Sequence, residues 1–211
     1  MRFIVTGFLL LTLSGGMFGQ PAEKLKSGPP PGTGLPGSFA PININGDGKD
    51  RPRCLVTLYG SEPVIMVFAR EPADGKDAAL MELMKKLDDF VAKHRERELH
   101  GCMIFLSGDA RSSVTDPGEK DQTKLVEEAQ AREALILRLE PRTKDLKEII
   151  VAAHHQAPAK YLINDKAEVT VLYYRKQVVE ASFAFAPGQL KAEDIDLILK
   201  TVDSRLPKVM D

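Results

Sequence analysis

The thiol groups of this 211-residue sequence are limited to Cys54 and Cys102. Cys54 opens a Cys-x-x-Thr sequence that ends at Thr57, with Arg51 and Arg53 as the nearby cations. A lone thiol of this kind could perform monothiol exchange or form a sulfenic acid if it is exposed and its thiolate is stabilised. Cys102 begins an apolar run, which favours an inert core thiol. One disulfide between the two cysteines stays open as an alternative.

Metal chemistry is suggested by two further patterns, and neither is complete. Residues 43–48 match the first half of a calcium-binding loop, but the twelfth position is Cys54, where a bidentate Glu is needed. His154 and His155 are adjacent, and on a helix they would point about 100° apart. We therefore predict a turn and solvated histidines, with no metal site and no other cofactor.

Charge and motif content exclude several classes of function. The net charge is −1 and the basic residues are spread along the chain, so no electrostatic footprint for nucleic acid is present. The sequence contains no glycine-rich phosphate loop and no recognisable nucleophile elbow. Oligomeric state and the identity of any partner stay open at this stage.

The N-terminus has the pattern of an export signal. Arg2 is followed by an apolar run that is too short to span a bilayer as a mature helix, and small residues follow it. We expect residues 1–19 to be a signal peptide, residues 20–38 to be a Pro/Gly-rich tether, and residues 39–211 to form one domain. The mature protein should then be periplasmic or extracellular, with no integral membrane span.

Strand and helix patterns alternate through the domain. The apolar run at 63–69 predicts a central strand buried on both faces, and the three- and four-residue spacing over 77–99 predicts an amphipathic helix. An N-terminal hairpin is expected around the turn at 46–50. The further expected elements are strands at 39–45, 53–59, 102–106, 134–139, 169–173 and 178–185, and helices at 122–133, 143–155 and 189–206.

Parallel β-α-β units followed by an antiparallel hairpin and a C-terminal helix resemble the thioredoxin fold. The preceding hairpin is similar to that of the peroxiredoxin and extracytoplasmic thiol-disulfide reductase branch, and residues 35–41 (Leu-Pro-Gly-Ser-Phe-Ala-Pro) resemble the loop that precedes it there. The resemblance covers residues 34–206. It implies an α/β domain with a central mixed sheet flanked by helices and an N-terminal β-hairpin extension.

The chain departs from this family where the family's chemistry is located. The two positions of its Cys-x-x-Cys motif, after the central strand, correspond to Pro72 and Gly75, and no Cys, Ser or Thr lies nearby. The cis-proline that precedes the penultimate strand is replaced by Val169. In redox-active relatives the adjacent groove holds an extended peptide. The resemblance therefore implies a remnant of that groove lined by Pro72, Glu168 and Val169.

Two functional hypotheses follow. The first is an exported thioredoxin-like protein that has lost dithiol catalysis and binds a peptide or protein. The alternative is a thiol oxidoreductase or peroxidase that uses Cys54 alone. Whether the protein is an enzyme is left open by the sequence.

Overall fold

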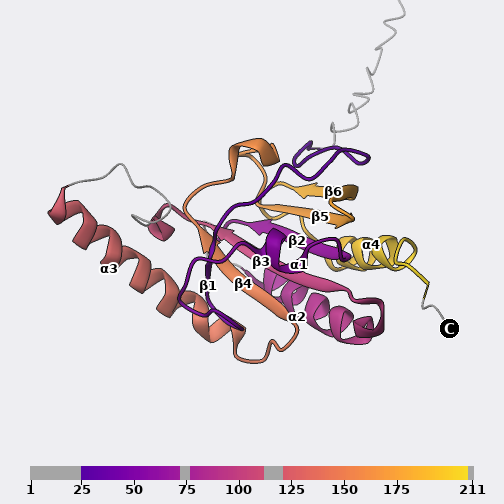
Figure 1. The fold of residues 1–211 in the computed structure, drawn as a ribbon, viewed down its shortest axis with the longest axis horizontal. Coiled ribbons are helices and arrows are strands. Elements are labelled where there is room, and N and C mark those ends of the chain that lie inside the picture. Colours follow the sequence, from indigo (N-terminus) through magenta and orange to yellow (C-terminus); the bar gives the residue numbers. More distant parts are fainter. Residues whose placement is uncertain (1–24, 72–76, 112–120, 209–211) are drawn as a thin grey trace, which may run out of the picture.

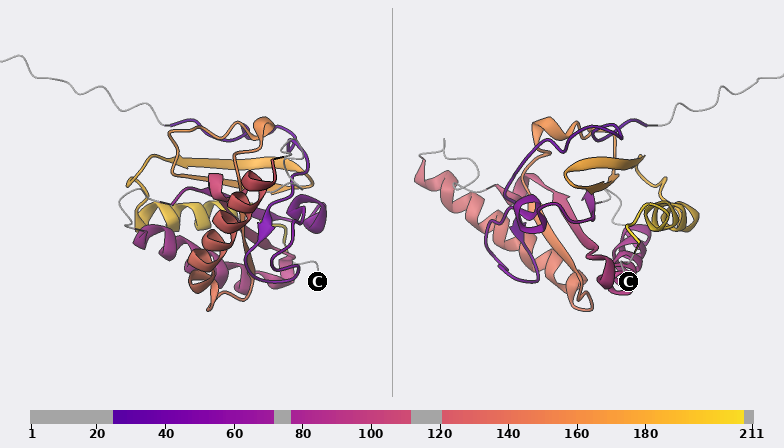
Figure 2. Two further views of the ribbon diagram at one scale, coloured as in Figure 1. Left: turned by 90° about the vertical axis from the view of Figure 1, so that its left-hand side faces the viewer. Right: turned by 45° about the vertical axis from the view of Figure 1, so that its right-hand side comes forward.

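The computed structural model describes residues 25–71, 77–111 and 121–208. Within them a six-stranded sheet has the order β1-β4-β3-β2-β5-β6. The strands are β1 (Ile42–Asn43), β2 (Val64–Ala69), β3 (His100–Leu106), β4 (Ile149–His154), β5 (Val169–Arg175) and β6 (Val178–Phe185). The α-helices are α1 (Leu55–Tyr59), α2 (Ala78–Lys93), α3 (Gln122–Leu139) and α4 (Ala192–Asp203). Figures 1 and 2 show helices on both sides of the sheet.

The central strand is β2, as the apolar run predicted. It pairs in parallel with β3 and antiparallel with β5, and β3 pairs in parallel with β4. Alternate side chains enter two separate cores, because neighbouring residues of a strand point to opposite faces. Ile65 and Val67 belong to the core under α2 and α4, whereas Met66 and Phe68 belong to the core under α1.

The β5–β6 hairpin is confirmed and has a two-residue turn. Lys176 and Gln177 both have positive φ, 51° and 57°. Both central residues of a type I′ turn need positive φ, and this turn matches the twist of the flanking strands. The C-terminal helix is also confirmed, as α4.

The strand and helix predicted between residues 134 and 155 were wrong. Helix α3 continues through residues 134–139, and β4 occupies part of the expected helix. Leu135 and Leu139 are buried four residues apart while Leu137 is 62% exposed, which is helical and not strand periodicity. Strand β4 starts where the Asp88 carboxylate on α2 accepts the backbone N–H groups of residues 147–149 at 2.8–3.1 Å.

The predicted N-terminal hairpin is reduced in the structure. β1 pairs antiparallel with β4. The returning chain forms an isolated bridge between Ile42 and Pro52, and the Asp50 N–H donates to the Asn43 carbonyl oxygen at 2.9 Å, but it forms no second strand. The predicted strand at 53–59 was wrong, because Leu55–Tyr59 is the short helix α1. Leu55, Val56 and Tyr59 are its buried residues, a spacing that fits one helical face.

Residues 25–38, the described part of the predicted tether, lie against β5 and β6 (Figure 1). The Ser27 hydroxyl is 2.6 Å from that of Thr170, and the Gly28 N–H donates to the Leu162 carbonyl oxygen at 3.0 Å. Farther along, the N–H of Val179 in β6 donates to the Thr33 carbonyl oxygen at 2.9 Å. We call residues 25–38 the N-terminal strap, because these hydrogen bonds hold the segment on the sheet.

Candidate functional site

The carboxyl ends of the parallel strands β2, β3 and β4 meet at one edge of the sheet, which we call the carboxyl edge. The chain leaves β2 at Arg70, β3 at Ser107 and β4 at His155. Strand β5 runs in the opposite direction and therefore begins at the same edge, with Val169 opposite Ala69. Ligands of open α/β sheets bind outside the carboxyl ends of the strands. A ligand site is therefore expected at the carboxyl edge.

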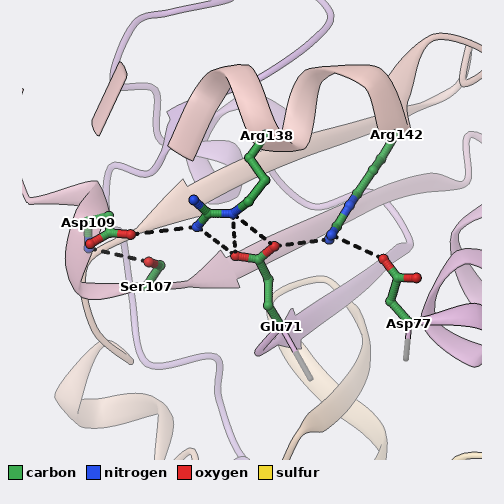
Figure 3. A network of polar contacts seen from close by, with 6 residues as sticks. All are labelled: Glu71, Asp77, Ser107, Asp109, Arg138 and Arg142. Atoms are coloured by element: carbon green, nitrogen blue, oxygen red, sulfur yellow. Dashed lines mark hydrogen bonds and ion pairs between the residues drawn. The ribbon is translucent and has the colours of Figure 1, made fainter. Parts of the chain in front are cut away.

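A network of charged side chains covers part of this edge (Figure 3). Glu71 accepts from Arg138, whose Nη2 is 2.8 Å and whose Nε is 3.2 Å from one carboxylate oxygen. Arg142 is paired with both Glu71, at 3.2 Å, and Asp77, at 3.1 Å. Asp109 lies 3.6 Å from Arg138. Two cations and three carboxylates thus share one cluster at the end of the central strand.

Ser107 and the C-terminal end of α3 position this network. The Ser107 hydroxyl accepts the N–H of Asp109 at 3.3 Å and begins the 3-10 helix η2 (Gly108–Ala110). Arg138 lies on the last turn of α3, and Arg142 follows on the 3-10 helix η3 (Glu140–Thr143). The network therefore depends on α3 reaching residue 139, which the sequence-based assignment missed.

The predicted binding residues lie at the same edge, as far as they are described. Pro72 and Gly75 lie outside the described residues, between Glu71 and Asp77. The N–H of Arg70 donates to the Glu168 carbonyl oxygen at 2.8 Å, so the end of β2 and the start of β5 are adjacent. The Val169 side chain is fully buried in the core. None of the described peptide bonds is cis, including the bond before Val169.

Aromatic side chains lie behind the edge on the α1 side of the sheet. Phe39 contacts His154 and Tyr161 edge-on, with ring centroids 5.6 and 5.2 Å apart. Burial lowers the pKa of the His154 imidazole, and its Nδ1–H donates to the Gln156 carbonyl oxygen at 2.6 Å. His154 ends β4 and is buried, so the expectation of a solvated histidine on a helix was wrong for this residue.

Cys54 is the N-cap of α1 and not a strand residue. Its Sγ accepts from the Thr57 hydroxyl at 3.1 Å and from the Thr57 N–H at 3.4 Å. The Cys-x-x-Thr spacing places residue N3 of the helix beside the cap, the same geometry that serine and threonine caps use. The thiol is half-buried. Its hydrogen bonds cap the first turn of α1.

Cys102 is an inert core residue by its environment. It is fully buried in β3, and burial raises the pKa of its thiol well above the ordinary value. Buried tyrosines surround it, among them Tyr59, whose hydroxyl donates to the Gly101 carbonyl oxygen at 3.4 Å. Both cysteines are free thiols, so the disulfide left open by the sequence is not formed in this structure.

Metal-binding clusters and membrane-spanning helices are both absent from residues 25–71, 77–111 and 121–208. These residues contain no group of three or more His, Cys, Asp or Glu side chains placed to hold a metal ion. None of the helices in the same part of the chain is long and apolar enough to cross a bilayer.

No protein-family model matches the sequence, and no curated protein matches it significantly. Solved structures do match. A candidate protein disulfide isomerase from Bacteroides thetaiotaomicron is similar with a TM-score of 0.55 at 12% identity, over 87% of this chain and 96% of that one. The fold is thioredoxin-like. A yeast mitochondrial 1-Cys peroxiredoxin has a TM-score of 0.52 at 7% identity, covering 83% and 76% of the two chains. The 2-Cys peroxiredoxin of Plasmodium vivax has a TM-score of 0.51 at 15% identity, covering 82% and 80%.

The thioredoxin-like fold expected from the element order is therefore confirmed. Within it, the edge that follows the central strand carries the Glu71–Arg138–Arg142 network. These arginines were not predicted as site residues, because residues 134–139 were assigned to a strand. The usable signal was the four-residue spacing of Leu135 and Leu139, which continues the preceding helix and brings Arg138 and Arg142 one turn apart.

Proposed function

We propose that this chain is an exported protein with a thioredoxin-like fold that has lost dithiol catalysis and binds a peptide or protein. The observation that carries the proposal is the chemistry at the carboxyl edge. The sequence between Glu71 and Asp77 contains no thiol or hydroxyl nucleophile. The residues that flank it, Glu71 and Asp77, are held by Arg138 and Arg142 in an ion-pair network. Ion pairs of this kind fix a surface but do not exchange disulfides.

The proposed binding surface includes Glu168 and the end of β2, after which Pro72 follows in the sequence. The contact between Arg70 and Glu168 supports this placement, since it joins the two segments by a backbone hydrogen bond. The Arg70 guanidinium adds a bond to the Ala167 carbonyl oxygen at 3.0 Å. Val169 would support this surface without contacting the ligand, because its buried side chain fixes the start of β5 in the core. Rigid supports of this kind lower the entropic cost of binding.

An insulin-reduction assay with dithiothreitol tests the loss of dithiol catalysis. The expected result is a rate equal to that of dithiothreitol alone, both for the native chain and for Cys54→Ser. Turnover by the native chain that disappears in Cys54→Ser would overturn the proposal.

Binding is tested with a thiol-blocked probe, the carbamidomethylated insulin B chain, so that neither disulfide exchange nor added carboxylates contribute. Fluorescence anisotropy is expected to show binding that Glu168→Lys weakens about tenfold, because a charge is reversed at the surface. Glu193→Lys is the control, since Glu193 is an exposed acidic residue on α4. Equal affinities for the two variants, or no binding by the native chain, would refute the proposed surface.

Export is tested by the N-terminus of the protein recovered from its native host. Mass spectrometry of the extracytoplasmic fraction should find a chain that begins after residue 19 or close to it. A cytoplasmic chain that retains residues 1–19 would contradict export.

The hydrogen bonds of Cys54 favour a second candidate, a monothiol oxidoreductase or peroxidase. Two donors from Thr57 point at one half-buried sulfur, so the thiol is held in one place and is partly accessible to a reagent. Iodoacetamide labelling of the folded chain across pH separates the two readings. Fast labelling of Cys54 at neutral pH that slows in Thr57→Val supports this candidate. A Cys54 that stays unlabelled until the chain unfolds is a structural helix cap.

A further inference from the structure

Helix α3 is attached to the rest of the protein mainly by its C-terminal half. Its 18 residues include just two that are buried, Leu135 and Leu139. Toward the middle, Arg132 donates to the Arg111 carbonyl oxygen at 2.8 Å. The first half of α3 projects beyond the sheet in Figure 1. An isolated helical segment of this length is marginal in water, so a packing partner would add stability.

The outer face of α3 carries an apolar residue near each end. Val126 is 56% exposed and Leu137 is 62% exposed. They are eleven residues apart, which is about three helical turns, so they lie on the same side of the helix. Gln130 and Glu133 lie between them on this side. These four positions, spaced by four, three and four residues, form the repeat by which two helices pack along a seam.

We propose that this face of α3 pairs antiparallel with α3 of a second copy of the chain. Under a two-fold axis between residues 131 and 132, Val126 of one copy lies against Leu137 of the other. Gln130 then lies against Glu133 of the other copy, so an amide N–H can donate to a carboxylate. The face is self-complementary, as a two-fold interface requires. The N-terminal half of each α3 would then pack on the C-terminal half of α3 in the other copy.

Charge and shape on α3 agree with this pairing. Glu127 lies on the first half of the helix and Arg138 on the second, both on the same flank of the seam, because eleven residues again separate them. Antiparallel packing brings Glu127 of one copy toward Arg138 of the other. Beside Leu137 there is a hollow of about 470 Å³, lined also by Ala129 and Ile136 and by the loop at Lys49. Val126 of the second copy would enter this hollow.

Sedimentation equilibrium of the full chain over a wide range of concentration tests the association. We expect a reversible dimer, and Leu137→Glu should weaken it by at least about tenfold, because a charge would be buried at the seam. Leu197→Glu is the matched control, since Leu197 is an equally exposed leucine on α4, at 55%. Val126→Lys provides a second variant if Leu137→Glu fails to fold. A native chain that stays monomeric, or a control that dissociates equally, would overturn the proposal.

The register of the pairing is tested by disulfide trapping in a Cys54→Ser background, where the remaining Cys102 is buried. A mixture of Val126→Cys and Leu137→Cys chains should form a crosslink between the two variants. Val126→Cys alone should not, because its two copies would be about 16 Å apart along the seam, beyond the reach of a disulfide. Preferential crosslinking of Val126→Cys with itself would refute the antiparallel register. The inference does not depend on the proposed function.

Discussion

The guanidinium of Arg138 binds the carboxylate of Glu71 with two of its nitrogens, at 2.8 and 3.2 Å. Both side chains are partly shielded from solvent, with exposed fractions of 45% and 24%. This contact joins the last turn of α3 to the residue that follows the central strand. The structural consequence is that α3 and the carboxyl edge of the sheet depend on each other.

Glu71→Gln should therefore destabilise the protein by about 1 kcal/mol, because it removes the charge that two arginines share while leaving the size of the side chain unchanged. Chemical denaturation measures the change. Glu82→Gln is the control, since Glu82 makes a solvent-exposed i,i+4 pair with Lys86 at 3.1 Å and should change stability little. If the two variants are equally stable, the network does not contribute to the stability of the fold.

Asp88 is a buried carboxylate that connects α2 to the start of β4, and we expect its substitution to lower the free energy of unfolding more than that of Glu71. Its carboxylate accepts three backbone N–H groups that precede or begin β4. Asp88→Asn should cost about 2 kcal/mol, since one acceptor oxygen becomes an amide that faces N–H donors. Asp89→Asn is the neighbouring control on the exposed face of α2. An Asp88→Asn variant as stable as this control would show that the start of β4 is fixed by other contacts.

The elements predicted correctly from the sequence are those whose apolar runs fit only one type of secondary structure. The runs around Val67, Val171 and Ala181 gave three strands, because they are rich in β-branched residues and bounded by turn residues. The run Ala-Leu-Ile-Leu at 134–137 is short and apolar, and such a run fits a strand or a helix equally well. The four-residue spacing of Leu135 and Leu139 favours the helix, but it is a weak signal because Ile136 and Leu137 between them are also apolar.

The candidate site was predictable only in part for the same reason. Glu168 and the end of β2 were placed at one edge from the element order, and the structure joins them through Arg70. The arginine network required α3 to end at Leu139, so it could not be found once that segment was assigned to a strand. Cys54 was wrongly placed on a strand because a five-residue helix gives almost no periodic signal, although Thr57 at the N3 position was an available cue.

Acid pH is expected to destabilise the protein through its buried histidines. Burial lowers the pKa of His154 below its ordinary value of 6.5, and it acts in the same direction on His94 and His100. A lowered pKa means that the unfolded chain binds protons first. Their contribution to stability is therefore complete above pH 6.5 and is lost as the pH falls through the folded-state values.

Thermal unfolding followed by circular dichroism across this range measures the effect. His154→Asn should show a shallower decline of the melting temperature below pH 6.5, because its amide can still donate to the Gln156 carbonyl oxygen but does not titrate. A decline in His154→Asn as steep as in the native chain would assign the acid sensitivity to other groups.

The N-terminal strap gives the last prediction, because two of its glycines have the same φ but different surroundings. Gly28 and Gly32 both have φ of +87°. A Cβ atom on Gly28 would lie 2.6 Å from Leu172 Cδ2 and 3.0 Å from Ser182 Oγ, whereas one on Gly32 would meet nothing within 4 Å. Alanine at either position incurs the cost of positive φ, about 1 kcal/mol. At Gly28 the clash with the sheet adds about 1–3 kcal/mol.

The comparison of Gly28→Ala with Gly32→Ala therefore isolates the packing of the strap from its backbone conformation. Denaturant titration should place Gly28→Ala well below Gly32→Ala in stability. Limited proteolysis should cut Gly28→Ala within residues 25–38 faster than the native chain, since the strap would separate from Thr170 and Ser182. Two variants with the same stability and the same rate of cleavage would mean that the strap does not pack on the sheet in solution.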